Sequence, residues 1–152
     1  MDYVKYIREM VGHKPIILVG SVTILHKNNQ ILLQQRKAGA YGKWGLPGGL
    51  MELGESTEET ARREVFEETQ LVVGALNLVD VHSGPHSFIK VHNGDEFYCV
   101  VIAYETEDFK GTLKIDKEES LDFRYFSLKN LPENMVGSHH SLIQTFLKTR
   151  LK

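Results

Sequence analysis

The 152-residue chain has few of the features that mark secreted, membrane-bound or nucleic-acid-binding proteins. Cys99 is its only cysteine, so no intrachain disulfide can form, and its apolar neighbours predict an inert core residue. No apolar run is long enough to span a bilayer, and the N-terminus lacks the apolar stretch of a secretory signal. The net charge of −2 also argues against non-specific binding to nucleic acid. We therefore expect a cytoplasmic chain that binds neither membranes nor nucleic-acid polymers.

The composition is that of an ordinary globular protein, with 41% hydrophobic and 25% charged residues and no repeats. The length suits one domain with its own core, which we expect to span residues 1–152. Apolar spacing predicts helices near residues 3–12, 56–70 and 138–151. β-Branched and alternating runs predict strands at 16–25, 31–35, 76–82, 86–92, 96–104, 112–115 and 123–126. Strands interleaved with a few helices indicate an α+β fold, with a mixed sheet and helices on both of its faces.

Two short polar segments predict hairpins. The cluster at 27–30 joins the first two strands, and Asn93-Gly94 separates two later ones. Asn-Gly accepts positive φ at both central positions of a tight turn, which favours a two-residue hairpin. Residues 37–49 contain so many Gly and Pro residues that we expect a loop without regular structure.

The central helix has a start signal, because Ser56 and Glu59 match a capping box. Ala61, Val65 and Phe66 are expected to face the core, which leaves a charged opposite face. In the last helix the apolar face is predicted to consist of Leu142, Ile143, Phe146 and Leu147, and the residues at its start, His139 and His140, are expected at the surface.

Acidic charge is concentrated in residues 48–71, which hold seven glutamates. Glu64, Glu67 and Glu68 stand at i, i+3 and i+4 and share one helix face. Their mutual repulsion destabilises an isolated helix by about a few tenths of a kcal/mol per pair. A bound divalent cation would explain this cluster, because Mg²⁺ prefers oxygen ligands. The alternative is a solvated face on which glutamates pair with arginines such as Arg63.

The residues before the helix favour the metal. Pro47-Gly48-Gly49 permits close approach of the backbone and places a free carbonyl near the carboxylates. Gly54 allows a sharp turn beside Glu55 at the junction of loop and helix. The loop, the glycine pair and the three carboxylates together are more specific than any one of them.

This combination resembles the signature of the Nudix hydrolases (MutT-like proteins): a glycine, five residues, Glu, seven residues, then Arg-Glu-apolar-x-Glu-Glu-x-Gly-apolar. The matching positions are Gly49, Glu55, Arg63, Glu64, Val65, Glu67, Glu68 and Leu71. Gln70 stands where the family usually has glycine, which concerns the end of the helix rather than the chemistry. The lead-in at 44–49 and the segment at 123–128 also agree with the family's layout. The resemblance implies the Nudix fold, an α/β/α sandwich with a mixed β-sheet between helices.

The resemblance also implies an activity, the hydrolysis of a phosphoanhydride in a nucleoside diphosphate that is linked to another group. The implied cofactor is Mg²⁺, with Mn²⁺ as an alternative, because metal ions neutralise charge on phosphate oxygens and orient the attacking water. The residues implied as metal-binding are carboxylates and one carbonyl, those of Glu64, Glu67, Glu68, Glu55 and Gly48. Arg63 is expected to orient a glutamate of this set and to offset part of the repulsion, and Glu55 to support the cluster.

The general base stays open at this point. By resemblance it is a signature glutamate, Glu64 or Glu68, or a glutamate from a later loop, Glu118 or Glu119, of which Glu119 is preferred. Arg36 ends a predicted strand, where related enzymes place an arginine that contacts phosphate or base, although a surface arginine would have the same pattern.

Aromatic residues and histidines have two interpretations each. Tyr41 and Trp44 either stack on a base or pack over the loop, and Phe88 and Tyr98 either line a pocket or belong to the core. The histidines at strand ends lack partners at ligand spacing and are not expected to bind metal: His82, His86 and His92.

The expected partner is a small nucleotide, but its identity stays open between nucleoside triphosphates, ADP-ribose, nucleotide sugars and dinucleoside polyphosphates. Pro85, fourteen residues after Leu71, lies close to where ADP-ribose enzymes often have proline. Phe88 lies where dinucleoside polyphosphate enzymes often have tyrosine. The alternative to an enzyme is a catalytically weak or inactive Nudix-fold domain that binds a nucleotide for regulation. An RNA-decapping role lacks the basic patches it would need, and the oligomeric state stays open, although many family members form homodimers.

Overall fold

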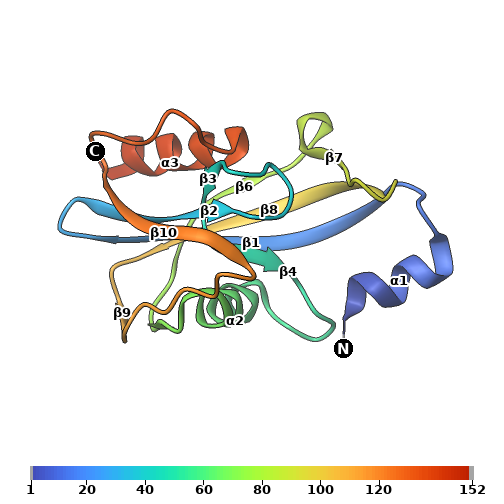
Figure 1. Ribbon diagram of the computed structural model, residues 1–152, viewed down its shortest axis with the longest axis horizontal. Coiled ribbons are helices and arrows are strands. Elements are labelled where there is room, and N and C mark those ends of the chain that lie inside the picture. The colour runs from blue at the N-terminus through green and yellow to red at the C-terminus, as the bar shows by residue number, and fades with distance from the viewer. Residues whose placement is uncertain (1, 151–152) are drawn as a thin grey trace.

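The computed structural model describes residues 2–150. The elements in chain order are α1 (Tyr3–Val11), β1 (Ile16–Lys27), β2 (Gln30–Arg36), β3 (Trp44–Gly45), β4 (Gly48–Leu50), α2 (Thr57–Thr69), β5 (Val72–Val73), β6 (Asn77–His82), the short 3₁₀ helix η1 (Pro85–Ser87), β7 (Phe88–Lys90), β8 (Glu96–Thr106), β9 (Phe109–Lys110), β10 (Ser120–Ser127) and α3 (Gly137–Arg150). Figure 1 shows a curved sheet with α3 on one face and α2 on the other. Within residues 2–150, no helix combines the length and the apolar character needed to cross a membrane.

The main sheet has the strand order β10-β2-β1-β8-β6, with β3, β4 and β7 paired to the sides of this path. β1 and β8 run parallel, with Ile16 opposite Phe97 and Leu25 opposite Thr106, and the other pairs in this sheet are antiparallel. The mixed sheet with helices on both faces confirms the fold class predicted from the sequence.

Two apolar layers hold the helices against the sheet. Side chains alternate along β1, so that Ile24 belongs to the layer under α3 and Leu25 to the layer under α2. From the helices, Ile143 of α3 enters the first layer and Val65 of α2 the second, and both are fully buried. Because both faces of the sheet are covered, consecutive residues are buried in β1 and at the start of β2, where Ile31, Leu32 and Leu33 are all fully buried.

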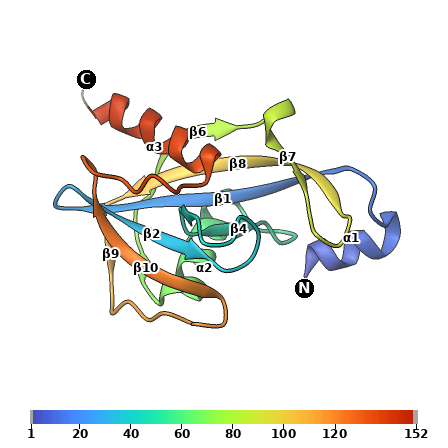
Figure 2. The ribbon, with the colours of Figure 1, turned by 45° about the horizontal axis from the view of Figure 1, so that its top comes forward.

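The helix α1 lies outside this sandwich. None of its residues is buried, and it lies beyond the end of the sheet where β1 begins, beside the turn between β7 and β8 (Figure 2). Polar contacts hold it there, since Arg8 donates to the carbonyl of Glu96 at 2.6 Å.

The first predicted hairpin is confirmed and the second is confirmed with a different turn. Asn28 and Asn29 both have positive φ, 53° and 61°, between β1 and β2. Between β7 and β8, however, Gly94 has positive φ while Asn93 does not, so the predicted two-residue turn is wrong. The backbone N–H of Val91 instead bonds to Asp95 across a wider loop.

Three further predictions about regular structure are wrong or incomplete. Residues 112–115 do not form a strand: Leu113 and Ile115 alternate because both pack on the layer under α2 while the chain crosses it. Phe66 is 47% exposed, and α2 buries Thr60 and Thr69 beside Ala61 and Val65. The loop at 37–49 includes β3 and the start of β4.

The helix ends agree closely with the sequence signals. Ser56 caps α2 by accepting a hydrogen bond from the N–H of Glu59 at 3.0 Å. Helix α3 ends at Arg150 in the part described, and Leu151, the predicted last residue, lies outside the described residues. Cys99 is buried, and burial raises the pKa of its thiol to about 11, which agrees with an inert core residue.

Gln70 ends α2 in the left-handed conformation, with φ 66° and ψ 8°, and its N–H bonds to the carbonyl of Phe66 at 2.9 Å. This is the position at which the signature has glycine. A side chain in this conformation costs about 1–2 kcal/mol, which glycine avoids.

We expect Gln70→Gly to raise the free energy of unfolding by about 0.5–1 kcal/mol, because the relief of strain exceeds the added entropy of the unfolded chain. Gln70→Ala is the matched control and should give no such gain, since alanine keeps the strained Cβ. Urea unfolding of the wild type and the two variants measures these stabilities. Equal stabilities for the glycine and alanine variants would contradict backbone strain at Gln70.

Candidate active site

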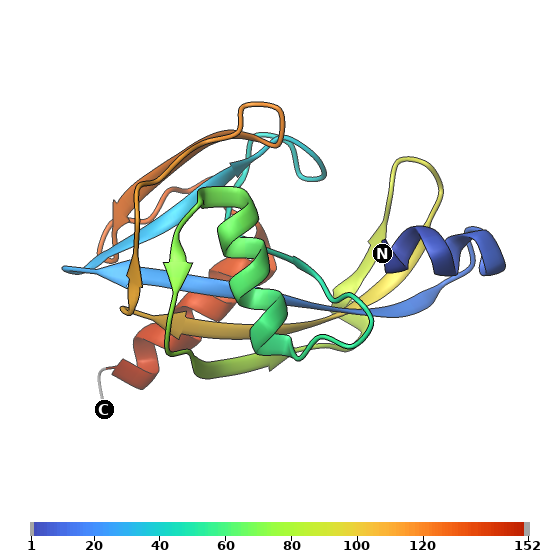
Figure 3. The ribbon, with the colours of Figure 1, turned by 90° about the horizontal axis from the view of Figure 1, so that it is seen from below.

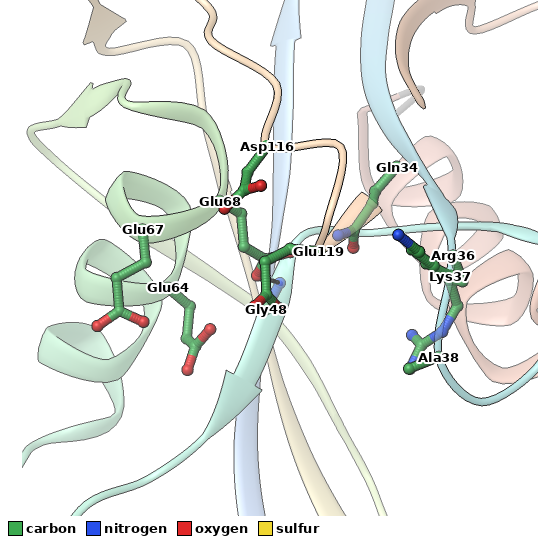
Figure 4. A pocket seen from close by; sticks show the side chains of 10 residues that line it. All are labelled: Gln34, Arg36, Lys37, Ala38, Gly48, Glu64, Glu67, Glu68, Asp116 and Glu119. Atoms are coloured by element: carbon green, nitrogen blue, oxygen red, sulfur yellow. Dashed lines mark hydrogen bonds between the residues drawn. The ribbon is translucent and has the colours of Figure 1, made fainter. Parts of the chain in front are cut away.

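A cleft of about 450 Å³ opens between α2, the end of β2 and the segment before β10. Acidic side chains line one side of it, namely Glu64, Glu67 and Glu68 of α2 with Asp116 and Glu119. Gln34, Arg36 and Lys37 line the other side (Figure 4). The pairing of β10 with β2 creates this arrangement, because Ser120 lies opposite Arg36 and thereby places Glu119 at the end of β2.

Arg63 organises the acidic side of the site. Its guanidinium donates to both carboxylate oxygens of Glu55, at 2.6 and 2.9 Å, to Glu64 at 2.8 Å and to the carbonyl of Leu50 at 3.0 Å. A longer contact of 3.3 Å reaches Glu67 on the next turn of the helix. These bonds hold the pKa of Glu55 low, at about 2, chiefly because Arg63 bonds to its ionised form.

Both glycines of the lead-in are required by contacts at this site. A Cβ on Gly49 would overlap the carboxylate of Glu64, and a Cβ on Gly48 would overlap the backbone of β1 at Ser21. The N–H of Gly48 donates to Glu68 at 3.0 Å, so β4 carries one polar contact to the helix. The close approach predicted from the glycine pair is therefore present.

Burial opposes the negative charge on two of the carboxylates. The pKa of Glu68 rises to about 8, mainly because the group is buried and then because Glu64 is near, against smaller effects of Gly48 and Gln34. Burial also raises the pKa of Glu64, although Arg63 acts in the opposite direction. Because burial disfavours the ionised forms of these two carboxylates, a cation bound between them would stabilise those forms.

The opposite side of the cleft carries positive charge. Arg36 is half-buried, its Nε has no hydrogen-bond partner among the described residues, and burial lowers its pKa. Lys37 donates to the carbonyl of Lys117 at 2.9 Å, which ties the end of β2 to the segment before β10. A partly desolvated guanidinium with no carboxylate partner in the described part of the chain is suited to an anionic ligand.

The structure distinguishes between candidate site residues that the sequence pattern could not tell apart. Glu119 lines the cleft and Glu118 does not. Asp116, which no motif of the sequence singles out, also lines the cleft. Tyr41 and Trp44 lie outside it: Tyr41 is 71% exposed, and Trp44 is buried edge-on against Phe126.

His139 was expected at the surface and is instead buried. Its Nδ1 accepts a hydrogen bond from the N–H of Leu46 at 2.9 Å, which links α3 to the lead-in before Gly48. Burial, with smaller effects of Arg36 and His82, lowers the pKa of His139 to about 3. No local pattern in the sequence distinguishes His139 from its exposed neighbour His140.

The donor set of the acidic side consists of oxygens, as hard divalent cations prefer. Within residues 2–150, no three carboxylate, imidazole or thiolate groups are arranged as a ready-made metal site. Glu67 is more exposed than Glu64, and its carboxylate contacts Arg63 at 3.3 Å from the rim of the cleft.

Comparison with known proteins identifies the family. The NUDIX domain model matches residues 15–146. ADP-ribose pyrophosphatase of Methanocaldococcus jannaschii is 32% identical over 126 residues, which is 82% of this chain and 70% of that protein. NAD-capped RNA hydrolase NudC of Vibrio cholerae is 32% identical over 120 residues, 79% of this chain but only 41% of NudC.

Solved structures agree. The MutT NUDIX hydrolase from Burkholderia pseudomallei superimposes with a TM-score of 0.71 at 25% identity, over 86% of this chain and 98% of that one. The NUDIX domain of Shewanella oneidensis NrtR, solved with ADP ribose, has a TM-score of 0.69 at 21% identity with full coverage of both chains, which shows a shared fold. The chain belongs to the Nudix hydrolase family, as its signature predicted.

The buried His139 predicts that stability falls in mild acid. Its pKa is about 3 in the folded protein and about 6.5 in the unfolded chain, so the unfolded chain binds the proton first. The contribution is complete above about pH 6.5 and is lost as the pH falls toward 3, by about 2 kcal/mol at pH 5.

We expect His139→Gln, which keeps an acceptor for Leu46, to lose less stability between pH 7.5 and pH 5 than the wild type does. His140→Gln, a change of the exposed neighbour, should keep the pH dependence of the wild type. Urea unfolding at both pH values measures the loss of unfolding free energy. Equal losses for the wild type and His139→Gln would rule out this role of His139.

Proposed function

We propose that this Nudix protein is a divalent-metal-dependent pyrophosphohydrolase that cleaves the diphosphate of ADP-ribose or of a related nucleoside diphosphate linked to a sugar. The observation that carries the proposal is the cleft itself, in which the half-buried carboxylates of Glu64 and Glu68 face Arg36 across a space that a diphosphate would occupy. This chain covers 70% of the ADP-ribose pyrophosphatase of Methanocaldococcus jannaschii, and the name of that relative directs the choice of substrate.

The metal would be Mg²⁺, or Mn²⁺, held by Glu64, Glu67, Glu68 and the carbonyl of Gly48. The raised pKa of Glu68 supports this, because a carboxylate that burial disfavours as an anion gains most from a bound cation. When bound, the metal would neutralise charge on the phosphate oxygens. Glu55 has both oxygens bonded to Arg63, so we assign it to hold Arg63 rather than to bind metal.

The protein's own groups then have separate tasks. Arg36 binds the anionic phosphates, and Arg63 keeps the carboxylate of Glu64 in place. Glu119 takes a proton from the attacking water, whose oxygen bonds to phosphorus as the bridging P–O bond breaks. The products from ADP-ribose are AMP and ribose 5-phosphate, so atoms and charges balance without a further reactant.

A hydrolysis screen tests this function. We expect ADP-ribose with Mg²⁺ or Mn²⁺ to yield AMP, measured by ion-exchange chromatography, and EDTA to stop the reaction. Nucleoside triphosphates, nucleotide sugars, NAD and dinucleoside polyphosphates are the comparison substrates. Absence of AMP from any diphosphate with either metal would contradict the proposal and favour a non-catalytic nucleotide-binding domain.

In the same assay we expect Glu68→Gln to lower kcat by at least about a hundredfold, because the amide removes a charge needed for the metal. Glu58→Gln is the matched control, since Glu58 lies on the same helix but is exposed and outside the cleft. Circular dichroism and thermal unfolding should show that both variants fold. Full activity of Glu68→Gln with saturating Mg²⁺ would exclude the assigned ligand set.

The neighbouring glutamates before β10 test the base. We expect Glu119→Gln to lower kcat by about 10²–10⁴-fold with little change in KM, as for the loss of a general base. Glu118→Gln should retain activity, because Glu118 does not line the cleft. Equal effects of the two changes would refute Glu119 as the base and leave a signature glutamate, Glu64 or Glu68, in that role.

A further inference from the structure

A second cleft lies on the other side of Glu64. It measures about 380 Å³. Its lining residues are Asp2 and Val4 at the start of α1, Leu50 at the end of β4, Met51 and Glu52 in the loop that follows, and Arg63 and Glu64 of α2. Glu64 lines both this cleft and the one that contains Glu68. The two spaces therefore adjoin at the side chain that Arg63 holds.

Helix α1 forms one wall of the second cleft because a chain of hydrogen bonds attaches it to the site. The N–H of Tyr3 donates to Glu52 at 2.7 Å, and the N–H of Glu52 donates to Glu55 at 2.8 Å. Glu55 in turn binds Arg63, which binds Glu64. Figure 1 and Figure 3 show the start of α1 beside the loop that joins β4 to α2.

These contacts hold the start of α1, as the contacts of Arg8 hold its end, and α1 has no buried residue. The helix packs no side chain into either apolar layer, so the position of its start depends on Glu52. Two of its first amides are already bonded, since Asp2 accepts from the N–H of Lys5 at 3.1 Å and Glu52 from that of Tyr3. The carboxylates that accept these bonds also make the helix start unfavourable for a phosphate.

The charge of the second cleft also disfavours a phosphate. Three carboxylates line it, those of Asp2, Glu52 and Glu64, against the single guanidinium of Arg63, which already binds Glu55 and Glu64. Its remaining walls are the apolar side chains of Val4, Leu50 and Met51, and no aromatic side chain among residues 2–150 lines it. Carboxylate acceptors beside an aliphatic wall suit an uncharged group with several hydroxyl donors, which is the chemistry of a sugar.

We infer that the second cleft binds the sugar attached to the far phosphate of the substrate, and that α1 is thereby part of the substrate site. The inference rests on the proposed function, because it needs a diphosphate placed at Glu64. The nucleoside and its phosphate lie on the Arg36 side, and the sugar lies against Val4 and Met51. Sugar-linked diphosphates are preferred to triphosphates, because a further phosphate would meet three carboxylates.

NMR of the methyl groups tests this placement in the slowed Glu119→Gln variant. This variant is titrated in the presence of Mg²⁺ with ADP-ribose, AMP and ribose 5-phosphate at millimolar concentration. We expect ADP-ribose and ribose 5-phosphate to shift the methyl signals of Val4 and Met51, and AMP to leave them unchanged. Ala38 reports on the first cleft, and Met10, on α1 but 67% exposed and outside the second cleft, is the control.

Matched substitutions on α1 give the second test. We expect Val4→Trp, which fills the cleft, to raise KM for ADP-ribose by about tenfold or more, while KM for the minimal substrate ADP β-methyl ester stays unchanged. Met10→Trp makes the same change on the same helix away from the cleft and should leave both values as they are. Thermal unfolding confirms that the two variants fold.

The outcomes separate the two proposals. Hydrolysis of ADP-ribose without shifts at Val4 and Met51, or shifts there with AMP instead of ribose 5-phosphate, overturns the inference and leaves the proposed function standing. An equal rise in KM for both substrates in Val4→Trp also overturns it. If ADP-ribose is neither hydrolysed nor bound, both the inference and the proposed function are overturned.

Discussion

The hydrogen bonds of Arg63 are the interaction on which the site depends. One guanidinium bonds to Glu55, Glu64 and the carbonyl of Leu50, and so joins α2 to the loop before it and to β4. A helix with neighbouring carboxylates would otherwise be destabilised by their repulsion. Because the arginine offsets part of this repulsion within the protein, the carboxylates stay close together and in position to receive a cation.

The charges of the first cleft are kept apart rather than paired. Carboxylates lie on the α2 side and Arg36 lies on the β2 side, where its Nε has no partner among the described residues. Ion pairs across the cleft would neutralise the groups that the proposed metal and diphosphate need. Holding each sign on its own rigid element orients the groups in advance, which is the form of electrostatic stabilisation that costs least reorganisation during a reaction.

Local signals in the sequence predicted most elements well, and the errors have a common origin. The Asn28-Asn29 hairpin and the Ser56 cap were predictable because they depend on neighbours in the chain. The alternation at 112–115 has the pattern of a strand, but it arises because Leu113 and Ile115 both pack on the apolar layer under α2. His139 could not be told from His140, since burial depends on the distant lead-in that it contacts.

The sequence by itself determined the family, the fold class and the helix face that carries Glu64, Glu67 and Glu68, because a periodicity of 3.6 residues is a local property. Only the tertiary structure decided which charged groups meet that face. Glu119 faces the cleft and Glu118 does not because of the register between β10 and β2. The start of α1 reaches the site through Glu52, a contact across 49 residues of sequence that no local pattern encodes.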